Sequence, residues 1–188
     1  MRKIGLILFI IGIVITVRYG YEHWHTMNSV SDFNGDIEQI VNELNKETKY
    51  ETGEYVANLI IPKLNKSYEV YWGTDDDTLA KGVGMYVSEW TVPPGEEGHT
   101  VLSGHRDSVF RPLGELDNGD RFHVIYKGVN YEYEINKIWI TDAEDRSVIV
   151  EKEEPTLTLS TCYPFTYIGN APDRYIIQAH LIQKESLL

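Results

Sequence analysis

The sequence predicts an all-β fold, preceded by an apolar segment at the amino terminus. Three observations lead to this prediction. Between residues 55 and 182, short runs rich in β-branched and aromatic residues recur, and turn-forming Gly, Pro and Asp separate them. Little helical periodicity lies between these runs, which is typical of antiparallel sheet closed into a barrel or folded into a sandwich. The 188 residues suffice for one such domain with an appendage.

The amino-terminal segment has the features of a membrane anchor. An apolar run, residues 4–17, lies between Lys3 and Arg18. As a helix this run reaches about 21 Å, short of a hydrocarbon core of about 30 Å, so the flanking basic side chains would have to extend the span by snorkelling. A cleaved signal peptide is the alternative, but no small-x-small cleavage site follows. We therefore expect an uncleaved transmembrane anchor over residues 1–20. With Arg2 and Lys3 inside, the rest of the chain lies outside the cytoplasm.

A linker separates this anchor from the β domain. Within residues 31–46, Ile37, Ile40, Val41 and Leu44 follow the spacing of one helical face. We expect a short amphipathic helix there, as part of a juxtamembrane segment over residues 21–53. The β domain then occupies residues 54–188.

Seven runs within this domain have the composition of strands. They cover residues 55–62, 67–72, 99–104, 121–126, 129–140, 156–161 and 174–182. The longest irregular stretches between them are residues 74–98, 141–155 and 163–173. Loops of this length usually carry function.

Charge and cysteine content exclude several classes of protein. The chain has 17 basic and 29 acidic residues, a formal charge of -12, which disfavours nucleic acid as a partner. Its single cysteine, Cys162, cannot form an internal disulfide and is therefore free to react. We expect no cofactor and no metal.

The carboxylates of Asp142, Glu144 and Asp145 have the chemistry of calcium ligands, but a solvated acidic loop is the more common role for such residues.

Cys162 lies where a strand ends. In the run TLTLST, Thr156, Thr158 and Ser160 share one face, and Cys162 continues that face just before Pro164 stops the strand. If the chain returns as an antiparallel strand from Arg174, these two residues lie at the same rim of the sheet. His180 is six residues further along that strand, roughly 20 Å from the rim, so it is excluded as a partner.

His105 also follows a strand end, in the segment HTVLSGHRD. It joins the same rim if this strand runs parallel to the strand of Cys162, which is an assumption. On these patterns alone, Cys162 could equally be a small core residue, His105 a turn residue and Arg174 part of a surface ion pair.

A family resemblance decides between these interpretations. The motif TLSTC, with LSGHRDSVF and LGELDNGD upstream and CYPFTYIGNAPDRYIIQAHL around the cysteine, resembles the class D sortases of Gram-positive bacteria over residues 55–182. The resemblance implies an eight-stranded β-barrel transpeptidase with short helices. Cys162 would attack the Thr carbonyl of an LPxTG-like sorting signal and form a thioacyl intermediate. His105 would exchange protons with the leaving and incoming amines, and Arg174 would stabilise the oxyanion.

The resemblance also implies partners, a location and further site residues. The partners are secreted proteins with a carboxyl-terminal sorting signal and an amine of peptidoglycan or its precursor, and the enzyme is held at the outer face of the cell membrane. The loop at residues 141–155 corresponds to the specificity loop of the family. We expect Thr161 and Tyr163 to contact the substrate; Phe165 and Tyr167 either line the same groove or pack on the barrel edge.

Two other functions remain open on the sequence. An L,D-transpeptidase also uses a His and a Cys on a β fold, but its nucleophile lies in the sequence SHGC, which TLSTC does not match. A non-catalytic, membrane-tethered β module that binds wall polymer or a secreted protein would retain its function without the thiol of Cys162.

Overall fold

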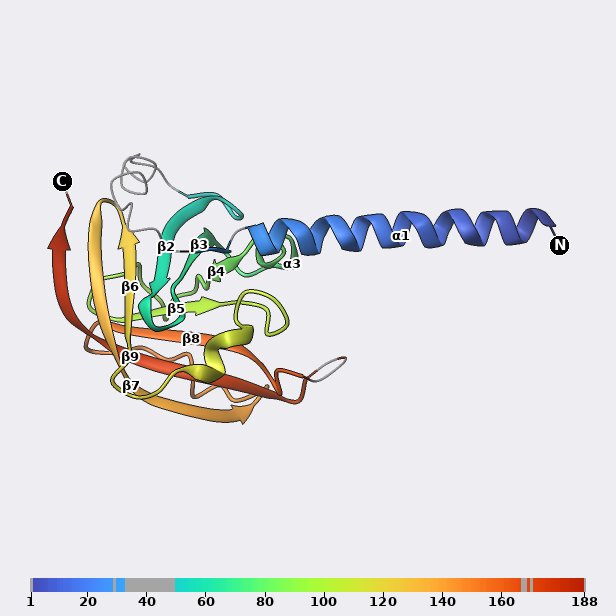
Figure 1. Ribbon diagram of the computed structural model, residues 1–188. Helices are drawn as coiled ribbons and strands as arrows, with labels where there is room; N and C mark the ends of the chain where they lie inside the picture. The colour runs from blue at the N-terminus through green and yellow to red at the C-terminus, as the bar shows by residue number, and fades with distance from the viewer. Residues whose placement is uncertain (1, 29, 33–49, 167–168, 170, 188) are drawn as a thin grey trace.

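Eight strands close into a β-barrel in the computed structural model, which describes residues 2–28, 30–32, 50–166, 169 and 171–187 (Figure 1). The all-β prediction is therefore confirmed. Around the barrel the order is β3-β2-β6-β7-β9-β8-β5-β4, and a β3–β4 pairing closes the ring. The strands are β2 Tyr55–Ile61, β3 Lys66–Trp72, β4 Val83–Met85, β5 His99–Ser103, β6 Arg121–Tyr126, β7 Val129–Asp142, β8 Thr156–Tyr163 and β9 Asp173–Ser186.

Two of the pairings in this ring are parallel, and one of them positions the site described below. Strands β5 and β8 run parallel, from His99 opposite Thr156 to Ser103 opposite Ser160. Strands β8 and β9 are antiparallel, with Cys162 opposite Arg174. The parallel pairing that the sequence analysis assumed is thus confirmed.

The barrel interior is filled by one alternating face of each strand. On β8, Leu157 and Leu159 are fully buried in the core, where they lie beside Leu102 of β5 and Ile177 of β9. This follows from the two-residue period of a strand, which sends alternate side chains to opposite faces. Thr156 and Thr158, which alternate with these leucines, therefore face the outside of the barrel, as Cys162 does.

The helices are short except at the amino terminus. Helix α3 (Asp76–Leu79) and the 3-10 helices η1 (Pro62–Leu64) and η2 (Arg111–Glu115) lie in connections between strands. Asp75 caps α3, because its carboxylate accepts the backbone N–H of Thr78 at 3.1 Å. The stretch expected to be irregular, residues 74–98, thus contains α3 and β4.

The amino-terminal helix α1 (Arg2–Asn28) projects away from the barrel (Figure 1). Large apolar side chains between Phe9 and Val17 are exposed along it. Among the residues described, no helix combines the length and apolar content required to cross a membrane. The anchor expected at residues 1–20 stays a prediction.

Strand β1 (Val30–Asp32) follows α1 and pairs antiparallel with β3 outside the closed ring. The amphipathic helix expected over residues 31–46 is not tested: Ser31 and Asp32 belong to β1, and residues 33–46 lie outside the described residues.

Candidate active site

Three adjacent strands bring Cys162, Arg174 and His105 to one end of the barrel. We call this end the β8 rim: the carboxyl ends of β5 and β8 together with the start of β9. Cys162 is the second-last residue of β8, and Arg174 is the second residue of β9. His105 follows the end of β5 by two residues. Segments more than fifty residues apart in the sequence therefore meet at this rim.

Cys162 and Arg174 are direct neighbours across the β8–β9 ladder. Paired Cα atoms of antiparallel strands lie about 5 Å apart, and their side chains point to the same face. Cys162 is a free thiol and half-buried. The guanidinium of Arg174 is also half-buried, and its Nη1 donates to the carbonyl of Asp173 at 3.0 Å, which limits its orientations.

His105 continues the register of β5 beside β8. Ser103 pairs with Ser160, so two residues further along each strand His105 falls in line with Cys162. Neighbouring strands lie about 4.8 Å apart. The backbone N–H of Gly104 still donates to the carbonyl of Ser160 at 3.3 Å, so the register persists to the residue before His105. The imidazole of His105 is exposed, where a substrate could exchange a proton with it.

The alternation of the strands also puts the three residues on the same face. On β5, His99, Val101 and Ser103 share the outer face. Continuing this alternation by two residues predicts the same face for His105. Cys162 and Arg174 share that face because the leucines beside them fill the interior. Strand alternation therefore predicts that the thiol, the imidazole and the guanidinium face one surface, outside the hydrophobic core.

Thr161 fixes the strand ends to each other. It is 3% exposed, and its hydroxyl donates to the carbonyl of Gly104 at 2.7 Å. This bond ties the residue before Cys162 to the residue before His105. Because the hydroxyl is buried and occupied, the structure favours a positioning role for Thr161 over the substrate contact predicted from the sequence.

Tyr163 belongs to an aromatic cluster rather than to the thiol face. Its ring stacks with Tyr175 at 6.0 Å and meets Phe165 edge-on at 5.6 Å. Strand alternation directs Tyr163 to the face opposite Cys162. Of the two environments predicted for Phe165, the structure places it against the barrel core. Tyr167 lies outside the described residues.

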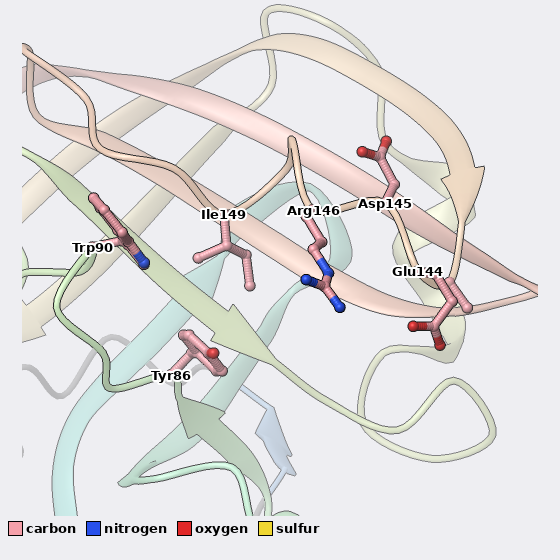
Figure 2. A pocket seen from close by; sticks show the side chains of 7 residues that line it. Tyr86, Trp90, Glu144, Asp145, Arg146 and Ile149 are labelled. Carbon is pink, nitrogen blue, oxygen red and sulfur yellow. The ribbon is translucent and has the colours of Figure 1, made fainter.

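A pocket of about 410 Å³ lies beside this face, between the β4–β5 and β7–β8 loops. Tyr86 and Trp90 form one wall. The opposite wall comes from the β7–β8 loop, from which Arg146 and Ile149 extend towards Tyr86 (Figure 2). Ala143, Glu144 and Asp145 complete the lining. The sequence predicted the importance of this loop but did not single out Trp90. The signal would have been a Trp directly before a Pro- and Gly-rich segment.

Carboxylates of the β7–β8 loop shape its first turn. Asp145 accepts hydrogen bonds from Ser147 and from Thr141, and these bonds lower the pKa of its carboxyl. Thr141 pairs with Arg174 on β9, so the carboxylate of Asp145 is held near the β8 rim. Asp142 accepts the backbone N–H of Glu144 at 2.8 Å. In the described part of the chain, no group of three or more acidic, His or Cys residues could hold a metal ion.

The remaining described histidines of the barrel lie away from the rim. His180 pairs with Thr156 at the opposite end of β8, as the sequence predicted. His123 lies on β6. His99 begins β5 and is completely buried, with Nε2 2.7 Å from the hydroxyl of Thr158 and Nδ1 2.8 Å from the carbonyl of Val150. Burial lowers the pKa of His99, so the imidazole is neutral at pH 7.

This arrangement has the components of thiol-based acyl transfer. A thiol can attack a carbonyl carbon, an imidazole can carry the proton of the leaving or entering amine, and a guanidinium offers a planar pair of donors to an oxyanion. Backbone bonds and strand pairing hold two of the groups in place before any substrate arrives, which reduces the reorganisation that reaction requires.

Comparisons with known proteins show which family the chain is similar to. A family model described as Sortase domain matches residues 59–182. Sortase D of Bacillus subtilis is 48% identical over 130 residues, which cover 69% of this chain and 65% of the B. subtilis protein. The chain thus spans slightly less than two thirds of that relative.

Solved structures match the barrel. The catalytic domain of B. anthracis SrtD is 59% identical, with a TM-score of 0.66 over 75% of this chain and 96% of that one. A Clostridium perfringens Sortase D5 transpeptidase is 30% identical, with a TM-score of 0.65 over 81% of this chain and 92% of that one.

Proposed function

The chain belongs to the sortase family, and we propose that it is a class D cysteine transpeptidase acting on proteins that carry an LPxTG-like sorting signal. One observation supports the proposal: in the order β9-β8-β5, Cys162 pairs with Arg174, and β5, which His105 follows by two residues, runs parallel to β8. The family match makes an L,D-transpeptidase or a non-catalytic binding module a poorer account of the same residues.

In the first half of the reaction, the thiolate of Cys162 attacks the carbonyl carbon of the Thr in the sorting signal. The negative charge that develops on the carbonyl oxygen is stabilised by the guanidinium of Arg174, the neighbour of Cys162 across the ladder. The C–N bond then breaks, the amine leaves with a proton from His105, and a thioester remains on Cys162. Arg174 suits this role because its charge is permanent and its fork is planar.

In the second half, an amine of peptidoglycan or its precursor attacks the thioester. His105 takes the proton that this amine loses, a new amide bond forms, and the thiolate of Cys162 is released. The exposure of His105 supports this exchange with a group arriving from solvent. No cofactor takes part.

The pocket beside the β8 rim is the proposed groove for the sorting signal. Its wall of Arg146 and Ile149 belongs to the β7–β8 loop, the expected specificity loop. We predict that replacing residues 143–155 by the loop of a sortase with another sorting signal shifts the preference of the enzyme towards that signal, measured as kcat/KM on both peptides. An unchanged preference would contradict the assignment of the groove.

We also propose that residues 1–20 hold the domain at the outer face of the cell membrane. The proposal rests on the sequence and on the exposure of apolar side chains along α1, including Phe9 at 66% and Val17 at 65%. A helix that is apolar on all sides is typically covered by protein or lipid. Fractionation of cells expressing the chain should find it in the membrane pellet, resistant to carbonate extraction; recovery in the soluble fraction would refute the anchor.

Incubation of the full chain with LPxTG-like peptides and hydroxylamine tests the catalytic proposal. Mass spectrometry should detect the Thr hydroxamate, and Cys162→Ala should abolish it. Action on peptidoglycan tetrapeptide stems alone would instead favour an L,D-transpeptidase. Full biological function in the Cys162→Ala variant would favour a binding module.

A further inference from the structure

The side chain of His99 links strand β8 to the β7–β8 loop, which forms one wall of the pocket. His99 starts β5 and is 0% exposed, although it is remote from the β8 rim and takes no part in the proposed chemistry. Its side chain contacts Thr158 on strand β8 and Val150 on the β7–β8 loop. Val150 adjoins Ile149, which lines the pocket (Figure 2).

The contacts of His99 determine the position of its proton. The carbonyl of Val150 can only accept a hydrogen bond, so Nδ1, 2.8 Å away, carries the hydrogen. In the neutral ring Nε2 is then an acceptor, and the hydroxyl of Thr158 donates to it over 2.7 Å. The result is a directional chain of hydrogen bonds from Thr158 through the imidazole to the loop backbone.

This chain of bonds ties the middle of the β7–β8 loop to strand β8. The loop crosses from β7 to β8, and its first turn is held by Asp142, the last residue of β7, and by Asp145 of the loop. Near its centre, Val148 is buried at 9% exposed, whereas Val150 is 37% exposed and has less packing of its own. Removing the imidazole would leave the carbonyl of Val150 and the buried hydroxyl of Thr158 without these bonds, at a cost that favours displacement of the loop.

The main chain of His99 contacts the other wall. Its carbonyl accepts the backbone N–H of Val92 at 3.0 Å, and Val92 is two residues from Trp90. This bond does not depend on the side chain. A substitution of His99 should therefore loosen the wall of Ile149 and leave the wall of Trp90 in place, which provides an internal control.

We propose that His99 is a positioning residue for substrate recognition: it fastens the β7–β8 wall of the pocket to strand β8 and thereby sets the affinity for the sorting signal. The inference rests on the proposed function, because it takes the pocket as the groove for that signal. It predicts an effect on KM rather than on kcat, since His99 lies at the opposite end of β5 from His105.

Four variants of the full chain in detergent test this role. His99→Leu removes both hydrogen bonds, and Thr158→Val removes one of them while keeping the shape of the side chain. His99→Gln retains a donor and an acceptor and should restore part of the function. His123→Gln, on β6 and outside the pocket, is the matched control for the loss of a histidine.

Hydrogen exchange measured by mass spectrometry gives a readout independent of catalysis. In His99→Leu and Thr158→Val, exchange should accelerate in peptides from residues 143–155 and remain as in the wild type for the amide of Val92 and for strand β6. If exchange in the loop is unchanged in both variants, the proposed link is wrong. If His99→Leu fails to fold, Thr158→Val alone decides the question.

Peptide kinetics give the second readout. We expect His99→Leu to raise the KM for an LPxTG-like peptide about tenfold, Thr158→Val less, and kcat to change by less than about twofold in each. His99→Gln should fall between His99→Leu and the wild type, and His123→Gln should match the wild type. An unchanged KM in an active His99→Leu variant overturns the inference. Absence of turnover in the wild type overturns the proposed function instead. In that case the exchange experiment still tests the link between His99 and the loop.

Discussion

Replacement of Thr161 by Val tests how the β8 rim is assembled. The hydroxyl of Thr161 is buried and donates to the carbonyl of Gly104 at 2.7 Å. Val keeps the shape of the side chain but removes the donor, so the carbonyl of Gly104 loses this bond. A buried group deprived of its partner costs about 1–3 kcal/mol. At about 2–4 °C per kcal/mol for a domain of this size, the melting temperature should fall by about 2–12 °C.

The catalytic effect of Thr161→Val should exceed the effect on stability. Gly104 directly precedes His105, so loss of the bond allows the imidazole to move away from the thiol. A misplacement of about 1 Å can cost about a hundredfold in rate, and we expect kcat to fall about ten- to a hundredfold. The assay is hydroxamate formation from an LPxTG-like peptide at saturating concentration, together with a thermal melt.

Thr100→Val is a matched control for this experiment. The hydroxyl of Thr100, 2% exposed, donates to the carbonyl of Val92 at 3.0 Å, near the opposite end of β5. Its replacement should lower the melting temperature by a similar amount and change kcat by less than about threefold, because no catalytic residue adjoins the bond. Equal values of kcat for the two variants would refute the positioning role of Thr161.

Three further predictions concern the oxyanion, the backbone and pH. Arg174→Lys keeps the charge but loses the planar fork, so kcat for hydroxamate formation should fall about a hundredfold, and a fall of less than threefold would contradict the assigned role. Gly95→Ala places a Cβ 1.8 Å from the ring of Tyr131 at a φ of +83°, so the free energy of unfolding, measured with denaturant, should fall by more than about 2 kcal/mol. The control Gly119→Ala has a φ of +90° but nothing within 4 Å of the new Cβ, so its free energy of unfolding should fall by only about 1 kcal/mol. Burial lowers the pKa of His99 below its ordinary value of 6.5, so below pH 6.5 the unfolded chain binds a proton that the folded chain refuses. Folding stability should therefore decline further between pH 7.5 and 5.5 in the wild type than in His99→Gln, and equal declines in urea titrations would show that His99 does not contribute.

Strands with strong patterns were predictable from the sequence. The runs at residues 121–126 and 129–140 correspond to β6 and β7, because alternation on a half-buried surface leaves a clear two-residue period. Helix α3 and strand β4, of four and three residues, were missed since segments so short carry no measurable period. Strand β9 continues to Ser186, beyond the predicted end, because its polar carboxyl-terminal half pairs with β7.

The candidate site could be predicted in part. Cys162 and Arg174 follow from a strand and its antiparallel return, and the elimination of His180 follows from its distance along that return. The contribution of His105 depended on a parallel pairing of β5 and β8, which local sequence does not specify because these strands are over fifty residues apart.

The orientations of Thr161 and Tyr163 were the less predictable part. Both lie beside Cys162 in the sequence, and proximity suggested contact with substrate. Alternation along β8 instead directs them to the face opposite the thiol, where Thr161 bonds to Gly104 and Tyr163 packs with Tyr175. The linking role of His99 required knowledge of where the β7–β8 loop crosses β5, which is a property of the tertiary fold.

A crystal structure of the chain with a sorting-signal peptide covalently attached to Cys162 would test the central claim most directly. We predict that the peptide lies on the outer face of β5 and β8, against the β7–β8 loop, with the imidazole of His105 and the guanidinium of Arg174 on either side of the modified sulfur. Separation of the sulfur from either group by more than about twice the spacing of neighbouring strands, or a peptide bound on another face, would contradict it.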